Sequence, residues 1–282
     1  MESLTDELIR LSFAEDIQGG DVTTLSCIPQ SAGGRSDLLI KEDGILAGVR
    51  AARLIFSRFD PTLVVSEYAE DGSKVRKGDI AFSVQGKVRS LLQTERLVLN
   101  VMQRMSGIAT VTRKYVKEVE GTSARILDTR KTTPGMRLLE KEAVRIGGGV
   151  NHRIGLFDMI LLKDNHVDFA GGIREAITCA NNYKKESGRE DLKIEIEVRN
   201  AHELEEALET GGIDRIMLDN FSVEDTLEAV RRIAGRCQTE SSGGITLATA
   251  RAYALTGVDF ISVGALTHSV KSLDMSLKAS KA

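Results

Sequence analysis

The residues best suited to chemistry lie between residues 128 and 166, in two loops that carry several positive charges beside glycines. The first loop reads Asp-Thr-Arg-Lys-Thr-Thr-Pro-Gly from Asp128, and the second reads Gly-Gly-Gly-Val-Asn-His-Arg-Ile-Gly from Gly147. Charges on a soluble protein usually form a solvated face, but these lie next to short apolar segments of the kind that form buried strands. The group consists of Arg130, Lys131, His152, Arg153 and Lys163. Such a group predicts a ligand with several negative charges.

Two carboxylates at the ends of later apolar segments supply the opposite charge. Glu197 lies in the segment 193–198, and Asp219 ends the segment 215–219. Glu195 alternates with Glu197 and therefore shares its face of the strand, but Glu197 is nearer the carboxyl end and is preferred. The pair Glu197 and Asp219 is too sparse to enclose a metal ion. It suits Mg²⁺ that is held jointly by protein, substrate phosphates and water.

Two glycine-containing loops after the last apolar segments are typical of phosphate binding. The sequence Ser-Ser-Gly-Gly follows the segment 236–240, and Gly264 follows the segment 259–263. One such loop is more often a simple turn, whereas two at consecutive strand ends favour a phosphate site, since glycine lets backbone N–H groups approach closely. The residues expected there are Ser242, Gly243, Gly244, Val263 and Gly264.

The elements that must position these residues follow from an alternation of short apolar strands and amphipathic helices that begins near residue 122. Strands are expected at 125–128, 159–163, 193–198, 215–219, 236–240 and 259–263, with another near Val150. Strand–helix alternation predicts a parallel sheet, because each parallel return needs a crossover. The fold class is therefore α/β, and six or seven units favour an incomplete β/α barrel. An open doubly wound sheet is the alternative, although its Gly-x-Gly-x-x-Gly fingerprint is missing.

The chain before residue 122 has a different pattern. A helix is expected within residues 1–20, a strand-rich region at 36–90, and helical structure from 91 to 120. We therefore expect three parts. They are an N-terminal mixed α/β domain of the α+β sandwich type over 1–115, the β/α barrel over 116–270, and a C-terminal segment, 271–282, that packs back on the N-terminal domain.

Composition narrows the class of protein. The chain has 282 residues, 41% hydrophobic and 28% charged, with a net charge of −3, so its bulk charge does not suggest a nucleic-acid partner. No apolar run approaches the roughly 18–20 residues of a membrane span, and we expect neither a membrane partner nor a signal peptide. The three cysteines, Cys27, Cys179 and Cys237, are too widely separated for a disulfide framework or a metal motif. A reduced, cytoplasmic protein is the expectation.

These motifs together resemble one family, quinolinate phosphoribosyltransferase, also called nicotinate-nucleotide pyrophosphorylase (carboxylating). The resemblance runs along nearly the whole chain and rests on many motifs in order. They are the two cationic loops, Gly20–Thr24, Thr94–Thr110, Leu162–His166, Glu195–Val198, Met217–Asn220, Glu240–Thr246 and Ser262–Ser269. The resemblance implies an N-terminal mixed α/β domain and an incomplete β/α barrel. It also implies a Mg²⁺-dependent reaction in which quinolinate and phosphoribosyl pyrophosphate give nicotinate mononucleotide, pyrophosphate and CO₂, a step of de novo NAD synthesis.

The resemblance also implies residue roles. The residues implied to contact quinolinate are Thr129, Arg130, His152, Arg153 and Lys163, with Arg96 reaching in from a partner subunit. Lys131 and Lys163 would lie near the pyrophosphate, and Glu197 and Asp219 would serve the ribose hydroxyls, Mg²⁺ and the developing positive charge. The two late glycine loops would hold the 5′-phosphate. A homodimer or a higher homo-oligomer follows from the role of Arg96.

Three other functions are compatible with parts of the sequence. A phosphoribosyltransferase-like protein linked to molybdate uptake, or a transferase for another pyridine, would keep the fold and change the substrate. A Schiff-base aldolase would use Lys163 at a strand end, but it has little use for two phosphate loops and an acidic pair. A ligand-binding barrel without catalysis is the third possibility.

Overall fold

The computed structural model describes residues 2–280, which form two compact units that are each discontinuous in sequence. One unit contains the chain through Arg113, the segment Lys131–Gly148 and the chain from Ala265 onward. The other, called here the barrel unit, contains Lys114–Arg130 and Gly149–Gly264. Because these units are defined by contacts and not by independent folding, the expected boundaries at residues 115 and 270 stay a prediction.

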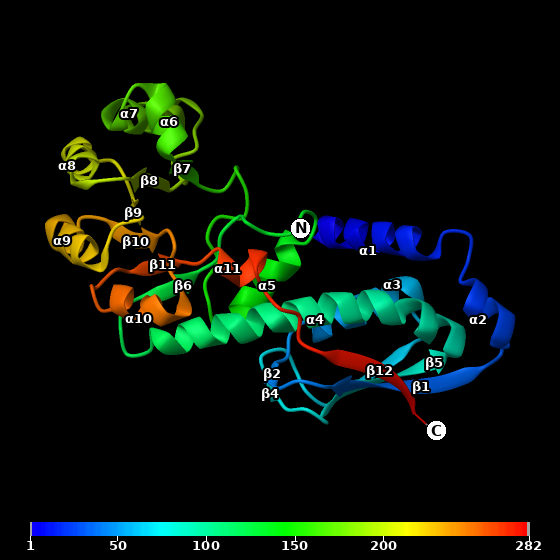
Figure 1. Cartoon of the computed structure of the whole chain (residues 1–282). Coiled ribbons are helices and arrows are strands. Elements are labelled where there is room, and N and C mark those ends of the chain that lie inside the picture. The colour runs from blue at the N-terminus through cyan, green and yellow to red at the C-terminus, as the bar shows by residue number, and fades with distance from the viewer. Residues whose placement is uncertain (1, 281–282) are drawn as a thin grey trace. The chain divides into compact units, whose positions relative to one another are not determined.

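The first unit is built on an antiparallel sheet with the strand order β12-β1-β5-β3. Its strands are β1 (Gly33–Ile40), β3 (Val64–Glu67), β5 (Ile80–Lys87) and β12 (Met275–Ser280), and a small second sheet pairs β2 (Gly44–Ile45) with β4 (Lys74–Val75). The last strand of the chain pairs with the first, from Arg35 opposite Ser280 to Ile40 opposite Met275. Figure 1 shows the red β12 running along the blue β1.

Helices accompany this sheet. They are α1 (Glu2–Ile17), α2 (Val22–Cys27), α3 (Val49–Phe59), α5 (Arg137–Ile146), α11 (Ala265–His268) and the long α4 (Val88–Glu118), which continues into the barrel unit. The helix expected in residues 1–20 is confirmed as α1. Helix α3 was not expected, because residues 36–90 were interpreted as strand-rich. Its buried residues Val49, Ala52, Ile55 and Phe56 nevertheless follow the helical spacing i, i+3, i+6, i+7.

The barrel unit contains a six-stranded parallel sheet with the order β6-β11-β10-β9-β8-β7. Its strands are β6 (Arg125–Leu127), β7 (Ile160–Leu162), β8 (Ile194–Val198), β9 (Arg215–Asp219), β10 (Gln238–Ser242) and β11 (Phe260–Ser262). Within the described residues, β6 and β7 form the two edges and do not pair with each other. Near Val150 there is only a single bridge to Leu127. The α/β class and the incomplete barrel expected from the sequence are thereby confirmed.

Amphipathic helices return the chain between these strands. They are α6 (Asp164–Ala170), α7 (Ile173–Glu186), α8 (Ala201–Thr210), α9 (Val223–Ile233) and α10 (Leu247–Ala254), which follow one another along the outer side of the strands in Figure 1. A core cluster unites strand and helix residues, such as Ile196, Ile216, Ile177 and Ile233. Ser222 is the N-cap of helix α9, and its side chain accepts from the Asp225 N–H.

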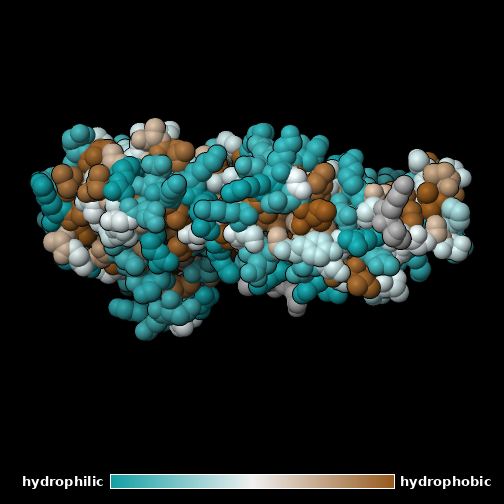
Figure 2. Space-filling view, turned by 90° about the horizontal axis from the view of Figure 1, so that it is seen from below, coloured by the Kyte–Doolittle hydropathy of each residue, from teal (hydrophilic) through white to brown (hydrophobic). Residues whose placement is uncertain are grey.

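No helix among the described residues is long and apolar enough to cross a membrane. Figure 2 shows one face of the molecule, on which hydrophilic residues predominate and apolar residues lie in small separate groups. Scattered apolar residues of this kind are usual on protein surfaces and indicate no particular partner.

Candidate active site

The carboxyl ends of the barrel strands gather the predicted polar residues at one edge of the sheet. In the parallel register, Asp219 of β9 lies opposite Ser242 of β10, and Leu162 at the end of β7 lies opposite Ile196 of β8. The sheet therefore brings a series of predicted site residues to the same edge, where parallel α/β folds place their ligands. They are Thr129 and Arg130 after β6, Lys163 after β7, Glu197 on β8, Asp219 on β9, Ser242 on β10 and Val263–Gly264 after β11.

The segment that carries His152 and Arg153 is fixed to the end of β6. The Val150 N–H donates to the Ile126 carbonyl at 2.8 Å. The fully buried carboxylate of Asp128 then accepts the backbone N–H of His152 at 2.8 Å and the side-chain amide of Asn151 at 2.5 Å. A buried carboxylate that takes such donors is a rigid anchor. Asp128 thus places two predicted binding residues beside the strand ends.

Two guanidinium groups lie close to each other at this edge. Arg153 is only 9% exposed and donates to the Met159 carbonyl at 3.2 Å. Burial lowers the pKa of its guanidinium, and the nearby Arg130 lowers it further, while Glu195 and Asp158 oppose the shift. Within the part of the chain that the structure describes, the buried Nε of Arg130 has no hydrogen-bond partner. Two neighbouring cations with an unused donor form a site for an anion.

The acidic pair lies on adjacent strands. Burial, and then the neighbouring charge of Asp219, raise the pKa of Glu197 to about 7, while Lys163 opposes this shift. The side-chain amide of Asn220 donates to Asp219 at 2.7 Å and holds that carboxylate. Two mutually repelling carboxylates beside a cationic site match the oxygen donors of Mg²⁺.

The glycine loop between β10 and α10 is shorter than expected. Ser241 and Ser242 belong to β10, because pairing with β9 continues to Ser242, so the prediction that the loop starts at Ser241 is wrong. The loop starts at Gly243, which has φ 93°, and a Cβ there would lie 2.1 Å from Oδ1 of Asn220. Gly244 also has positive φ, at 61°. The loop therefore requires glycine and lies directly against the residue that holds Asp219.

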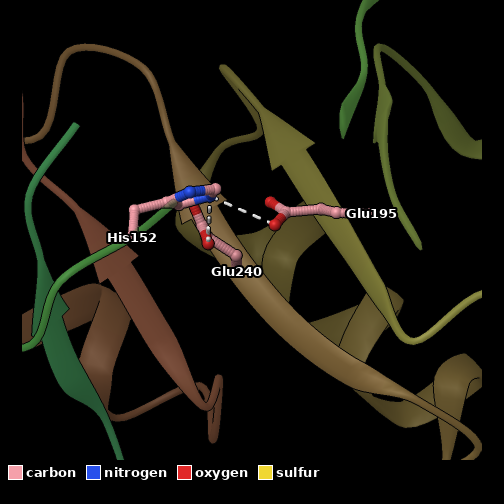
Figure 3. Close-up of side chains that lie close together, drawn as sticks. All are labelled: His152, Glu195 and Glu240. Carbon is pink, nitrogen blue, oxygen red and sulfur yellow. Dashed lines mark ion pairs between the residues drawn. The ribbon is translucent and has the colours of Figure 1, made fainter. Parts of the chain in front are cut away.

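A buried cluster below this edge was not predicted from the sequence. Figure 3 shows the imidazole of His152 between Glu195 and Glu240, with Nε2 at 3.1 Å and 3.6 Å from their carboxylate oxygens. Nη1 of Arg215 lies 2.9 Å from the Glu240 oxygen and 3.5 Å from the Glu195 oxygen. Burial raises the pKa of both glutamates to about 7. The two glutamates of β8 thus have different surroundings. Glu195 lies in the interior, whereas Glu197, which the sequence favoured as a site residue, is half-buried.

The donor types of this cluster could hold a metal ion, but two observations favour ion pairing among the side chains instead. The three ligand atoms of His152, Glu195 and Glu240 lie within 4.8 Å of one another. However, the Arg153 N–H donates to Nδ1 of His152 at 2.7 Å, so the ring proton must lie on Nε2, where a metal would bind. The guanidinium of Arg215 also supplies the positive charge that a metal would bring.

The structure also shows the surroundings of two further predicted site residues, Lys131 and Arg96, and of the other three histidines. Lys131 belongs to the first unit, is exposed, and its carbonyl accepts from the Thr267 hydroxyl at 2.8 Å. Arg96 is exposed on α4 in the same unit. His166 caps α6 by accepting the Lys163 N–H at 3.1 Å. His202 and His268 are exposed. The roles predicted for Lys131 and Arg96 stay predictions.

The fold and the site together define an α/β protein of the β/α-barrel type with an anion site and an acidic pair at the carboxyl edge of its parallel sheet. Two family models match the chain: the quinolinate phosphoribosyl transferase N-terminal domain over residues 21–106 and its C-terminal domain over residues 108–278. The chain belongs to the quinolinate phosphoribosyltransferase family.

Individual relatives agree with this assignment. The chain is 46% identical to a Nicotiana glauca protein named quinolinate phosphoribosyltransferase (decarboxylating) 2, mitochondrial, over 96% of this chain and 81% of that one. It is 41% identical to the probable nicotinate-nucleotide pyrophosphorylase (carboxylating) of Bacillus subtilis, over 96% and 92%. The crystal structure of NadC from Streptococcus pyogenes has a TM-score of 0.92 and 38% identity, and the match covers 100% of this chain and 99% of that one.

Proposed function

We propose that the protein transfers the phosphoribosyl group of phosphoribosyl pyrophosphate to quinolinate, with loss of CO₂, to give nicotinate mononucleotide and pyrophosphate. The observation that carries this proposal is the pair Arg130 and Arg153, two adjacent guanidinium groups of which one is buried and the other has a buried, unused Nε. A dicarboxylate neutralises such a pair, whereas a neutral or singly charged pyridine leaves positive charge unpaired.

The other residues divide the work between the two substrates. Thr129, Arg130, His152, Arg153 and Lys163 would serve quinolinate, and Lys131 with Lys163 would serve the pyrophosphate. The backbone around Ser242, Gly243 and Gly264 would hold the 5′-phosphate. With both substrates oriented, the pyridine nitrogen displaces pyrophosphate at the anomeric carbon, and fixed charges stabilise the oxocarbenium-like transition state. No covalent nucleophile from the protein is required.

Mg²⁺ is part of this proposal. Glu197 and Asp219 would hold it together with substrate oxygens and water, because two repelling carboxylates at a half-buried position favour a bound cation. When bound, the ion neutralises the charge on the departing pyrophosphate. Asp219 contributes through a carboxylate that Asn220 keeps in place.

One assay tests the activity. The protein is mixed with quinolinate, phosphoribosyl pyrophosphate and Mg²⁺, and nicotinate mononucleotide is measured. We expect product only with all three present. Arg130→Ala and Arg153→Ala should each lower kcat/KM for quinolinate roughly 10- to 100-fold, the effect of one lost charged contact. Arg231→Ala removes the same charge from an exposed position on α9 and is the matched control. No product from the wild-type protein would refute the proposal.

We also propose a homodimer, or a higher homo-oligomer, in which Arg96 completes the quinolinate site of the partner subunit. Support comes from the exposed position of Arg96 on α4 and from its place in the family motif Thr94–Thr110. Arg96→Ala and Lys163→Ala should each be nearly inactive. When the two are mixed and exchange subunits, a hybrid dimer holds one intact site, so random pairing restores roughly a quarter of the sites. Subunit exchange without any recovery of activity would contradict the shared site.

A cytoplasmic location completes the proposal. Cys27, Cys179 and Cys237 form no disulfide with one another, in keeping with a reducing compartment. Fractionation of cells that express the natural protein tests this location, and recovery in an organelle or an extracellular fraction would contradict it.

A further inference from the structure

Four ionisable side chains meet in the interior of the barrel unit below the proposed quinolinate site. They are His152, Glu195, Arg215 and Glu240, and each is at least nine-tenths buried. Two carboxylate oxygens lie between the Nε2 of the imidazole and the Nη1 of the guanidinium, at 2.9–3.6 Å. The cluster joins β8, β9 and β10 to the segment between α5 and β7, which carries His152.

This cluster is a poor source of stability. Among the described residues, both oxygens of Glu195, Oε1 of Glu240 and Nε of Arg215 are buried without a hydrogen-bond partner. Desolvated charges with incomplete partners cost free energy, and apolar side chains of similar size would often be as stable. A different role is needed to account for these four polar residues.

The cluster is connected to the proposed substrate site through the two sides of one imidazole ring. On one side, Nε2 of His152 faces Glu195 and Glu240. On the other side, Nδ1 accepts the backbone N–H of Arg153 at 2.7 Å. The orientation of the ring therefore fixes the backbone that carries the Arg153 guanidinium, which donates to the Met159 carbonyl.

The tautomer of His152 determines whether this connection exists. Nδ1 can accept from Arg153 only if the ring proton is on Nε2, and carboxylate oxygens beside Nε2 stabilise that proton. Arg215 keeps the two carboxylates together from the opposite side. Arg215 is held in turn by Gln238, which accepts from Nη2 at 3.2 Å, and by the Phe260 ring, whose centroid lies 4.1 Å from the guanidinium carbon.

We propose that Glu195, Glu240 and Arg215 are positioning residues that hold His152 in its Nε2–H tautomer and thereby set the Arg153 guanidinium for the dicarboxylate. This inference rests on the proposed function. It assigns His152 an indirect contribution to quinolinate binding, through Arg153, in addition to any direct contact. It also predicts that substitutions in this cluster weaken the binding of quinolinate and leave the binding of phosphoribosyl pyrophosphate unchanged.

The main test is a double-mutant cycle on quinolinate binding by the full-length protein, measured by calorimetry. Glu240→Gln keeps the size of the side chain and removes the negative charge from the group whose Oε2 faces both His152 and Arg215. We expect the Kd for quinolinate to rise about tenfold, or about 1.4 kcal/mol. KM for phosphoribosyl pyrophosphate should change less than twofold. In an Arg153→Ala background the same change should have no further effect, because Glu240 acts through Arg153. Glu228→Gln, at an exposed position on α9, is the matched control.

Two results of the double-mutant cycle would overturn the inference. One is an additive effect of Glu240→Gln and Arg153→Ala, and the other is an equal shift for both substrates. A second measurement reads the tautomer in the wild-type protein, from the ¹⁵N shifts of its four histidines. The His152 signal is assigned by its absence in His152→Asn. An Nδ1–H form in the wild-type protein also overturns the inference. Wild-type protein that binds no quinolinate refutes the proposed function instead, and the ¹⁵N measurement still tests the network.

Discussion

Arg130 and Arg153 demand more negative charge than a monocarboxylate can supply. Their proximity already weakens the protonated form of Arg153, so each negative charge that enters relieves a repulsion. Selectivity among pyridine acids is therefore expected to follow the number of carboxylates more closely than ring size.

Nicotinate, which has one carboxylate, should be a poor substrate. A site built for two carboxylates leaves a buried donor unpaired when one is missing, and such losses commonly amount to several orders of magnitude in kcat/KM. The measurement is turnover of nicotinate and quinolinate under the same conditions. Comparable turnover of the two acids would rule out the assigned role of the guanidinium pair.

Asp219→Asn should preserve the fold and lower kcat. The amide has nearly the same shape as the carboxylate but cannot supply the negative charge that favours Mg²⁺ and the developing cation. Circular dichroism checks the fold, and kcat measured against Mg²⁺ concentration checks the role. If kcat and its dependence on Mg²⁺ both stay at wild-type values, Asp219 has no part in the reaction.

At the scale of elements, the turn from β10 to α10 couples the proposed phosphate loop to the acidic pair. The Asn220 N–H donates to the Ser242 carbonyl at 2.9 Å, and the Asn220 amide holds Asp219. A change in Gly243 is therefore expected to reach Asp219.

Gly243→Ala should raise KM for phosphoribosyl pyrophosphate and lower kcat. Its Cβ would contact Oδ1 of Asn220 at 2.1 Å and its backbone nitrogen at 2.9 Å, so the loop must shift, at a cost of roughly 1–3 kcal/mol in stability. Gly235→Ala is the control, since Gly235 also has positive φ but has nothing within 4 Å of its Cβ position. If Gly243→Ala and Gly235→Ala have the same KM and kcat, the loop does not contribute to the reaction.

Particular residues show how far the sequence predicts these elements. Most barrel strands were placed to within a few residues because they are short apolar runs between polar segments. Strand β10 reads Gln-Thr-Glu-Ser-Ser and has no apolar residue, so its end was misplaced by two residues. Helix α3 was missed although Val49, Ala52, Ile55 and Phe56 have helical spacing. The turns on either side of this helix led to the interpretation of the whole region 36–90 as strand-rich.

The candidate site was predictable only where its residues follow strands directly. Lys163 directly follows β7, Asp219 ends β9 and Arg130 lies in the loop that follows β6, so local sequence is enough to find them. The cluster of His152, Glu195, Arg215 and Glu240 joins four segments whose contacts depend on tertiary packing. No spacing in the sequence marks these four residues as a group.

At the scale of the whole molecule, buried carboxyl groups should make stability depend on pH. The Glu195–Glu240 pair and Glu197 have folded pKa values raised to about 7 from 4.5. Between those values the folded state binds more protons than the unfolded state. The free energy of unfolding contributed by these groups therefore rises as pH falls from above 7 toward 4.5, and it falls as pH rises through 7.

Urea denaturation at pH 7.5 and pH 5.5 measures this dependence. The buried glutamates are expected to raise the urea midpoint of unfolding more at pH 5.5 than at pH 7.5. Glu240→Gln should flatten the profile because it removes one of the raised groups, whereas the exposed control Glu228→Gln should not. If the free energy of unfolding changes with pH by the same slope in wild type and in Glu240→Gln, Glu240 is ionised in the same way in the folded and the unfolded state.

The pairing of β12 with β1 has a consequence for synthesis on the ribosome. The sheet of the first unit receives its edge strand from Met275–Ser280, which leave the exit tunnel after the barrel unit. All residues of the barrel unit emerge earlier, since that unit ends at Gly264. The first unit is thus completed after the barrel unit, and the edge of β1 stays open until Met275–Ser280 emerge. Translation pauses between the codons for Gly264 and Met275 would lengthen that exposure and increase the time in which nascent chains can pair edge to edge.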